Sequence, residues 1–273
     1  MKKKLILLLI LISTTGVFAQ NKVYKSMSDA LLNPSAVRHL KITYDKLTQL
    51  PADISKLVNL EVLELNNNDL TELPDEICLL ANLKELNLFR NKLVKLPANI
   101  GNLKKLEKLI LSSNKLTQLP AGIGSLESLK QLSIKDNKLT SLPDEICNLK
   151  SLEQLFLSYN DLKSLPENIG NLKALEQLYL GNNMLLGLPE SISQLTQLQY
   201  FYLGKNSLAQ LPSSICSLVK LKELDISYSG GFGFLPNCLK NIEHLDILII
   251  DSNSTLPFSP TIFHNPNLRV IVK

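Results

Sequence analysis

The aromatic side chains of this sequence gather in one part of the chain. Five of the seven tyrosines lie between residues 159 and 228, and Phe156 precedes them. Phe156, Tyr179 and Tyr202 follow one another at a constant spacing of 23 residues. Tyrosine offers a large apolar area and a hydroxyl at little entropic cost, so it is common where proteins bind each other. The chemistry that this cluster indicates is binding, carried by Phe156, Tyr159, Tyr179, Tyr200, Tyr202 and Tyr228.

Residues that could support catalysis are scattered and do not form a motif. His39, His244 and His264 are isolated, and neither GxSxG nor HExxH occurs. Gly231-Phe232-Gly233 is too weak to indicate a phosphate-binding loop, because no strand-to-helix transition follows it. The absence of a CxxC pair leaves a zinc or redox site unsupported. We therefore expect no enzyme activity, no cofactor and no metal.

The spacing of the aromatic residues belongs to a repeat that runs through most of the chain. In the 23-residue unit, apolar residues recur at positions 1, 4, 6, 11, 14, 18 and 21. A period of this length predicts a solenoid in which each coil contacts only its neighbours. The alternation over positions 4 to 6 predicts one short strand per coil. The coils begin at Val37, Leu60, Leu83, Leu106, Leu129, Leu152, Leu175, Leu198 and Leu221, with an irregular tenth coil at Leu245.

The unit LxxLxLxxNxLxxLPxxIxxLxx resembles the leucine-rich repeat family, and the resemblance extends from Val37 to about Leu268. It implies an α/β solenoid, or horseshoe, with a parallel sheet on the concave face and short 3₁₀ or α turns on the convex face. It also implies a surface that binds other macromolecules. With its leader segment the chain is similar to secreted bacterial leucine-rich repeat proteins such as the internalins. Internalin repeats lack the Leu-Pro step, so their receptor contacts cannot be carried over.

Three other repeat positions indicate structural roles. Asn at position 9, from Asn68 to Asn206 and again at Asn253, can donate to and accept from backbone groups where the chain leaves the strand. Asp45 and Ser229 replace it, so those two coils should be less regular. Pro at position 15 should begin a short turn on the convex side. Position 19 holds only Gly, Ser or Cys, which indicates crowding by the next coil.

Cysteine spacing limits the possible disulfides. Cys78, Cys147 and Cys216 share position 19, three coils apart, which places them roughly 14 Å from one another at the usual strand spacing. A disulfide needs Cα atoms within about 7 Å, so these three cannot pair with one another. Only Cys216 and Cys238, on adjacent coils, are placed where pairing is conceivable, and the sequence leaves open whether they pair.

The solenoid pattern places most of the aromatic cluster on the outward side of the strands. Phe156, Tyr179 and Tyr202 occupy position 5, Tyr200 position 3, and Tyr159 and Tyr228 position 8, whereas Phe201 at position 4 points inward. One interpretation is a binding surface, since exposed apolar patches mark interaction sites. The alternative is cross-strand packing alone, because aromatic residues suit strands. Earlier coils carry Lys, Glu, Asn and Ser at the same positions, which favours the binding surface.

The two ends of the chain depart from the repeat. Residues 1–19 combine three lysines, an apolar run and Val17-Phe18-Ala19, which predicts a secretory signal peptide cut after Ala19. Residues 20–36 should form an N-terminal cap in which Ser26 or Ser28 starts a helix with Met27, Leu31 and Leu32 on one side. Residues 37–267 hold about ten repeats, and residues 268–273 should add a C-terminal edge strand. Near the end, Ser229-Gly230 begins a Gly-rich insertion whose Phe232 and Phe234 either cover the core or form a binding lip.

Charge and composition narrow the class of partner. The chain has 29 Lys and Arg against 25 Asp and Glu, and three of the lysines lie in the predicted signal peptide. This near-neutral balance does not favour nucleic acid or an anionic membrane, and we expect no membrane insertion after signal cleavage. We therefore predict an exported binding scaffold with a protein partner, located in the periplasm, at the cell surface or in the medium. A glycan-binding module and an envelope protein without a specific ligand remain as alternatives.

Overall fold

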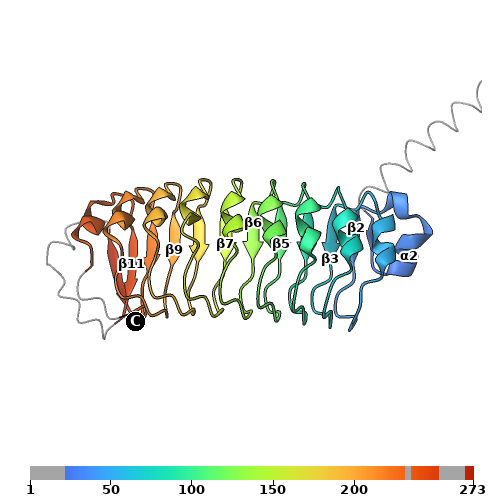
Figure 1. Ribbon diagram of the computed structural model, residues 1–273, viewed down its shortest axis with the longest axis horizontal. Helices are drawn as coiled ribbons and strands as arrows, with labels where there is room; N and C mark the ends of the chain where they lie inside the picture. Colours follow the sequence, from blue (N-terminus) through green and yellow to red (C-terminus); the bar gives the residue numbers. More distant parts are fainter. Residues whose placement is uncertain (1–21, 231–234, 252–267) are drawn as a thin grey trace, which may run out of the picture.

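The computed structural model describes residues 22–230, 235–251 and 268–273 of the chain (Figure 1). The predicted signal peptide, the insertion residues Phe232 and Phe234, and much of the tenth coil, including Asn253 and His264, lie outside these ranges. Within them, no helix is long and apolar enough to cross a membrane.

The described residues form a single parallel sheet of 12 strands that follow one another in chain order, which confirms the predicted solenoid (Figure 1). Equivalent repeat positions are register partners: Leu63 pairs with Leu86, and Leu86 with Leu109. The strands are β1 Val23–Tyr24, β2 His39–Lys41, β3 Val62–Glu64, β4 Glu85–Asn87, β5 Lys108–Ile110, β6 Gln131–Ser133, β7 Gln154–Phe156, β8 Gln177–Tyr179, β9 Tyr200–Tyr202, β10 Glu223–Asp225, β11 Ile247–Ile250 and β12 Arg269–Val272.

Short 3₁₀ turns form the side of the solenoid opposite the strands. In coil one, Pro51 precedes the turn as its cap, and its carbonyl accepts a hydrogen bond from Ile54 N–H. Proline suits this place because its backbone N–H is not needed there. It lies one residue earlier than predicted, before the turn instead of inside it. The turns are η1 Pro34–Ala36, η2 Ala52–Lys56, η3 Asp75–Leu79, η4 Ala98–Asn102, η5 Ala121–Ser125, η6 Asp144–Asn148, η7 Ile169–Asn171, η8 Glu190–Gln194, η9 Ser213–Ser217 and η10 Asn237–Asn241.

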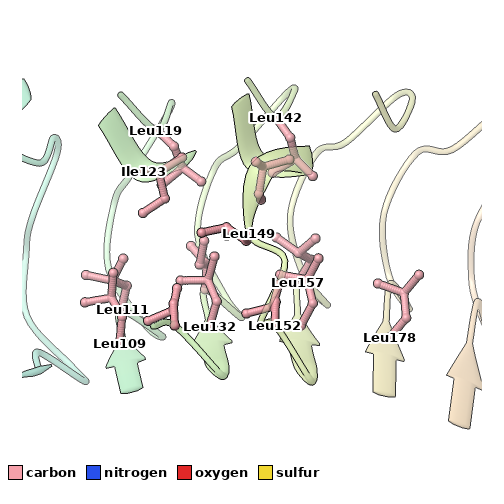
Figure 2. Close-up of a cluster of buried hydrophobic side chains, with 14 of the residues drawn as sticks. Leu109, Leu111, Leu119, Ile123, Leu132, Leu142, Leu149, Leu152, Leu157 and Leu178 are labelled. Atoms are coloured by element: carbon pink, nitrogen blue, oxygen red, sulfur yellow. The ribbon is translucent and has the colours of Figure 1, made fainter. Parts of the chain in front are cut away.

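The core lies between the strands and the turns, and repeat leucines and isoleucines fill it (Figure 2). Leu109, Leu132 and Leu178 are fully buried at the same repeat position, as is Phe201 in coil eight. Each such side chain contributes roughly 1.5–3 kcal/mol when it leaves water. Since this burial depends on the neighbouring coil, stability comes from stacking.

The predicted Asn ladder pairs backbone groups that the sheet leaves unpaired. The Asn68 amide donates to Ile42 O and Leu65 O, at 2.7 and 2.9 Å, and its Oδ1 accepts from Asp45 N–H and Leu47 N–H. Each side chain thereby joins its own coil to the preceding one. The same donor pattern recurs at Asn91, Asn114, Asn137, Asn160, Asn183 and Asn206.

Coil nine replaces the ladder amide with a serine. The Ser229 hydroxyl donates to Leu203 O, and the Ser229 backbone carbonyl accepts from Leu208 N–H in place of an Asn Oδ1. Gly230 follows with φ +147° and lies so close to Leu208 that a Cβ there would overlap its carbonyl. This turn therefore requires glycine at residue 230, since any Cβ there would overlap Leu208.

The N-terminal end of the core is covered by a strand and a helix. Helix α2, Met27–Leu32, has Ser26 as its cap, and the Ser26 hydroxyl accepts from Asp29 N–H. Met27 and Leu31 pack on the core, but Leu32 is 85% exposed, so the prediction that all three share a buried side was wrong. Successive residues of an α-helix are rotated by about 100° about its axis, so Leu32 points away from the side that carries Leu31. Strand β1 was not predicted; it pairs with β2 and buries Tyr24.

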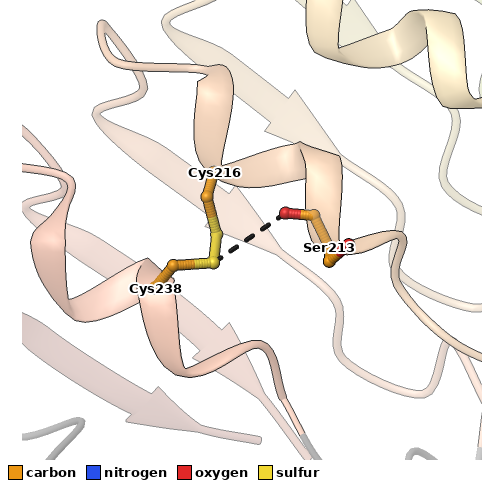
Figure 3. Close-up of a disulfide and its surroundings, with 3 residues drawn as sticks. All are labelled: Ser213, Cys216 and Cys238. Atoms are coloured by element: carbon orange, nitrogen blue, oxygen red, sulfur yellow. Dashed lines mark hydrogen bonds between the residues drawn. A yellow bond between two sulfur atoms is a disulfide. The ribbon is translucent and has the colours of Figure 1, made fainter.

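The cysteines divide into one disulfide and two buried thiols. Cys216 and Cys238 are joined, with Cα atoms 5.8 Å apart, and link η9 to η10 (Figure 3). Cys78 and Cys147 are free. Burial, with the nearby Asp75 charge, raises the pKa of Cys78 to about 11, and burial also raises that of Cys147. Both thiols occupy position 19, where a Cβ on Gly101, Gly124 or Gly170 would overlap the next coil, so the predicted crowding is present.

Candidate binding surface

Three aromatic rings form a continuous stack on the outward side of the sheet, here called the strand face. Phe156 on β7, Tyr179 on β8 and Tyr202 on β9 are register partners in turn. The ring centroids of Phe156 and Tyr179 lie 4.9 Å apart with planes tilted by 38°, and those of Tyr179 and Tyr202 lie 4.3 Å apart with planes at 15°. All three are partly exposed. The repeat register creates this stack, because one position on adjacent strands recurs at about 4.8 Å.

The other aromatic residues of the cluster surround the stack without joining it. Tyr200 lies on β9 between Gln177 and Glu223. Tyr159 and Tyr228 are 50% and 45% exposed and adopt left-handed backbone conformations, with φ of 59° and 55°. Lys135 Nζ lies 5.1 Å from the Tyr159 ring centroid. Here the name aromatic surface denotes Phe156, Tyr159, Tyr179, Tyr200, Tyr202 and Tyr228.

The phenol groups of the stack are held in their neutral form. Burial raises the pKa of Tyr202, and a hydrogen bond to the Glu223 carboxylate raises it further, since a carboxylate accepts a proton donor and disfavours a phenolate. Burial also raises the pKa of Tyr179, and this increase outweighs the opposing hydrogen bond with Tyr202. Both groups therefore act as hydroxyl donors and acceptors at physiological pH, not as charged groups.

A buried carboxylate ends the stack on its C-terminal side. Asp225 is the register partner of Tyr202, and its Oδ1 accepts from Ser227 N–H at 2.9 Å and from the Ser227 hydroxyl at 2.6 Å. Lys273 Nζ donates to the other oxygen at 2.8 Å. Sequence reasoning placed Asp225 on the strand face but missed the ion pair, because it joins residues 48 positions apart.

Two glycines occupy the repeat position that lies two residues after the ring residues of the stack. Gly181 and Gly204 occupy position 7 in coils seven and eight, where Phe89 stands in coil three and Lys135 in coil five. A Cβ on Gly181 would lie 3.0 Å from Gly204 O, and one on Gly204 would lie 3.2 Å from Asp225 Oδ1. A side chain at either position would therefore crowd the next coil, and Gly181 is itself buried. The two glycines could have been found from the sequence, because they occupy position 7 of consecutive repeats.

The strand face differs sharply between the first five coils and the later ones. Among the described residues, six ion pairs join repeat positions 2 to 5 of the first five coils, whereas the later coils have one pair there, between Asp225 and Lys273 at the C-terminal end. Glu64, for example, accepts from both Lys41 and His39 at 2.8 Å. The sequence suggested that His39 is isolated, but the structure shows that it contacts Glu64. The charges of the early coils neutralise one another, while the later coils present aromatic rings.

A single sheet of parallel strands stacked coil on coil, with short 3₁₀ turns on the opposite side, defines a solenoid scaffold with an open strand face. The sequence matches the family described as leucine-rich repeat region over residues 18–115. It also matches the family described as leucine rich repeat over residues 104–162, 127–185 and 173–230. The chain belongs to the leucine-rich repeat family.

Several solved structures are similar to this chain. A leucine-rich repeat protein of Leptospira interrogans is 32% identical, with a TM-score of 0.72, over 93% of this chain and 76% of that one. The functional domain of InlJ from Listeria monocytogenes, which includes a cysteine ladder, is 24% identical, with a TM-score of 0.70, over 86% of this chain and 47% of that one; it supports the fold alone.

A plant protein also matches. The leucine-rich repeat ectodomain of the membrane receptor kinase GASSHO1/SCHENGEN3 from Arabidopsis thaliana, in complex with CASPARIAN STRIP INTEGRITY FACTOR 2, is 29% identical with a TM-score of 0.59. This match covers 78% of the present chain and only 29% of the plant chain. Comparison with curated proteins gives no match.

Proposed function

We propose that this chain is a non-enzymatic binding scaffold that holds a protein partner on its aromatic surface. The observation that carries the proposal is the stack of Phe156, Tyr179 and Tyr202, which is partly exposed on the strand face. A partner that covered these rings would remove apolar area from water and could use the phenol hydroxyls for hydrogen bonds. The early coils offer ion-paired side chains instead, and such exposed pairs contribute little to binding.

The geometry of the stack favours a protein over a glycan. Tyr179 has Phe156 on one side and Tyr202 on the other, at 4.9 and 4.3 Å between centroids, so its ring faces are occupied. A sugar ring that packs against an aromatic face would find only the outer faces of the two end rings. Ring edges and hydroxyls remain available, and aromatic side chains of a protein can meet such edges in tilted or edge-to-face arrangements.

Similar proteins give limited support in the same direction. The plant ectodomain was solved in complex with CASPARIAN STRIP INTEGRITY FACTOR 2, which is an example of this repeat architecture with a bound partner. Nothing about the identity of that partner carries over to the present chain.

We also infer that the chain is exported, and this inference rests on residues 1–19. Their basic start, apolar run and Val17-Phe18-Ala19 end are the features of a signal peptide. N-terminal sequencing of material secreted into the periplasm or medium should begin at Gln20 or within a few residues of it. Mature exported protein that retains Met1 would contradict the inference.

The binding function is tested by one substitution in the stack and a matched control. Tyr179→Ala removes the central ring and should weaken binding of a captured protein by about 2 kcal/mol or more, the range of a central interface residue. Ile110→Ala is the control, because Ile110 is a partly exposed apolar residue at the same repeat position in coil four. Both variants would be used in pull-downs from envelope extract and on a glycan array.

Three outcomes are distinguishable. Loss of a protein partner with Tyr179→Ala, but not with Ile110→Ala, supports the proposal. Binding to glycans that depends on Tyr179, without a protein partner, would favour the glycan-binding alternative. If Tyr179→Ala binds every ligand as the wild type does, the aromatic residues serve only to pack the strands. The alternative of an envelope protein without a specific ligand would then be favoured.

A further inference from the structure

Repeat position 2, at the edge of the strand face, carries a row of charges whose signs alternate along the first six coils. Lys84 Nζ lies 2.7 Å from Glu61 Oε2, and Lys130 Nζ lies 2.8 Å from Glu107 Oε2. Arg38 is also within ion-pair distance of Glu61. Neighbouring coils thus neutralise each other, as opposite charges on adjacent strands should. In chain order the row reads Arg38, Glu61, Lys84, Glu107, Lys130, Glu153, Glu176, Gln199 and Lys222.

The alternation breaks beside the aromatic stack. Glu153 and Glu176 are consecutive members of the row, and Glu176 N–H donates to Glu153 O at 2.8 Å, which places the two acidic residues side by side. Both side chains are exposed, and no ion pair involves either of them within the described residues. Lys130 is already paired with Glu107, and Gln199 separates Glu176 from Lys222. Adjacent like charges lower stability, so this part of the row is not optimised for the isolated fold.

A third carboxylate lies further along the same side of the stack. Glu223 on β10 is the register partner of Tyr200, and its carboxylate helps to raise the pKa of the Tyr202 phenol. The basic side chains around the stack lie mainly on its other side: Lys135 contacts the Tyr159 ring, and Lys205 occupies position 8 between Asn182 and Tyr228. One side of the stack is therefore acidic, and neither of its two outer carboxylates, Glu153 and Glu176, forms an ion pair within the described residues.

We propose that the partner on the aromatic surface is a protein segment that presents Lys or Arg side chains to Glu153 and Glu176. The proposal rests on the function proposed above and specifies the chemistry of the partner. Basic side chains lay their apolar stems over ring edges while their charged ends reach a carboxylate. They would replace, from another molecule, the basic residue that the row lacks at coil seven. Charge complementarity of this kind selects partners and accelerates association.

A second copy of this chain fits the surface less well. The basic residues of its strand face in the early coils, including Lys41, Lys84, Lys108 and Lys130, are already within 2.7 to 3.1 Å of carboxylates. Docking another copy through them would break existing ion pairs. We therefore assign the segment to a different protein that brings unpaired basic residues. Self-association of the wild type through Lys135 and Lys205, which form no ion pair within the described residues, would overturn this assignment.

The test selects peptides from a displayed random library on the folded protein from Gln20 to Lys273. Peptides recovered on the wild type should be enriched in Lys and Arg over the unselected library. The double variant Glu153→Gln/Glu176→Gln should bind those peptides roughly five- to tenfold more weakly at low salt, the effect of losing two exposed ion pairs. Glu61→Gln/Glu107→Gln is the matched control, because it removes two acids at the same repeat position that are already paired.

The control variant should bind the peptides as the wild type does, and thermal melting would show that all variants are folded. If the peptides lack basic enrichment, or bind the Glu153→Gln/Glu176→Gln variant unchanged, the inference is wrong. Tyr179→Ala distinguishes the proposed function from the inference about the basic segment. Peptides that need Tyr179 but not the carboxylates would overturn only the inference about the basic segment. Peptides that bind Tyr179→Ala fully, or a library that yields no binders, count against both proposals.

Discussion

At the scale of single residues, Asn137 shows how much one side chain contributes to a turn. Its amide donates to Leu111 O and Ile134 O at 3.0 and 3.1 Å, and its Oδ1 accepts from Leu116 N–H at 3.0 Å. Asn137→Ala leaves Leu116 N–H without its partner, while Leu111 O and Ile134 O each keep one bond, from Asn114 and Asn160. The free energy of unfolding should therefore fall by roughly 1–3 kcal/mol. Urea denaturation measures the change, with Ser141→Ala, exposed on the same coil, as the control.

If Asn137→Ala leaves the free energy of unfolding unchanged, the Asn ladder does not have the structural role described here. The same variant, in the fraction that remains folded, should bind the partner as the wild type does, because Asn137 lies below the strand face and not on it.

Glu64 makes the stability of the first coils dependent on pH. Burial alone would raise the pKa of Glu64, but hydrogen bonds from Lys41 and His39 outweigh it and hold the pKa below its ordinary value of 4.5. A carboxylate with a lowered pKa in the folded state stabilises the fold above the unfolded pKa, and this contribution is lost as the pH falls through the folded pKa. Stability should therefore decrease on acidification below about pH 5, and less steeply in Glu64→Gln.

Thermal melting across that pH range measures the slope. Glu145→Gln is a suitable control, since Glu145 is exposed and forms no ion pair within the described chain. A wild type and Glu64→Gln with the same pH dependence would show that the His39, Glu64 and Lys41 contacts do not contribute.

At the scale of elements, the packing of one 3₁₀ turn on the next sets the size of the residue at position 19. A Cβ on Gly170 would overlap Ser191 O on η8, whereas one on Gly187 would meet nothing within 4 Å. Gly170→Ala should lower the free energy of unfolding by about 1–3 kcal/mol through overpacking. Gly187→Ala should leave it unchanged or raise it by several tenths of a kcal/mol, because alanine restricts the unfolded chain.

Chemical denaturation of the two variants side by side tests this difference. Equal stabilities for Gly170→Ala and Gly187→Ala would mean that the turns can separate without cost. The packing would then not explain why only Gly, Ser and Cys occur at position 19.

At the scale of the whole molecule, the disulfide secures the C-terminal coils. Cys216 and Cys238 join η9 to η10 across 22 residues, and removing a native disulfide of this kind typically costs about 2–4 kcal/mol. Cys216→Ser/Cys238→Ser should therefore lose hydrogen-exchange protection in β10 and β11 before β3 to β6. Each coil contacts only its neighbours, so the loss should stay local.

Alkylation followed by mass spectrometry provides the matching measurement on the wild type. Cys78 should resist labelling at pH 8 in the folded state, since its pKa is raised to about 11 and its side chain is buried. Protection lost evenly from β3 to β11 in the double variant, or a bridge that includes Cys78, would contradict this account.

The sequence predicted those features that repeat, because a period reports the same environment many times. The leucine core, the Asn68-type ladder and the row of Phe156, Tyr179 and Tyr202 follow from position alone. The stacking angles do not, since they depend on how each ring turns about its own bonds. The Asp225–Lys273 pair also escaped prediction, although an edge strand at residues 268–273 was expected, because the pair depends on Lys273 reaching across β11 to a residue of β10. The alternating charges at repeat position 2 can be found by aligning the repeats. Which of the carboxylates form ion pairs could be learned only from the structure.

The uniform register of the sheet has a consequence for how such a chain can change in length. Equivalent positions on neighbouring coils are partners throughout β2 to β10, and a ladder amide before a junction is matched by one after it. Removing or duplicating one whole repeat among coils two to five would therefore preserve the core and the ladder at the junction, while placing two like charges side by side at repeat position 2. The aromatic surface would keep its shape and shift by one strand spacing, about 4.8 Å, relative to the N-terminal cap. The number of early coils therefore sets how far the cap stands from the aromatic surface on coils six to nine.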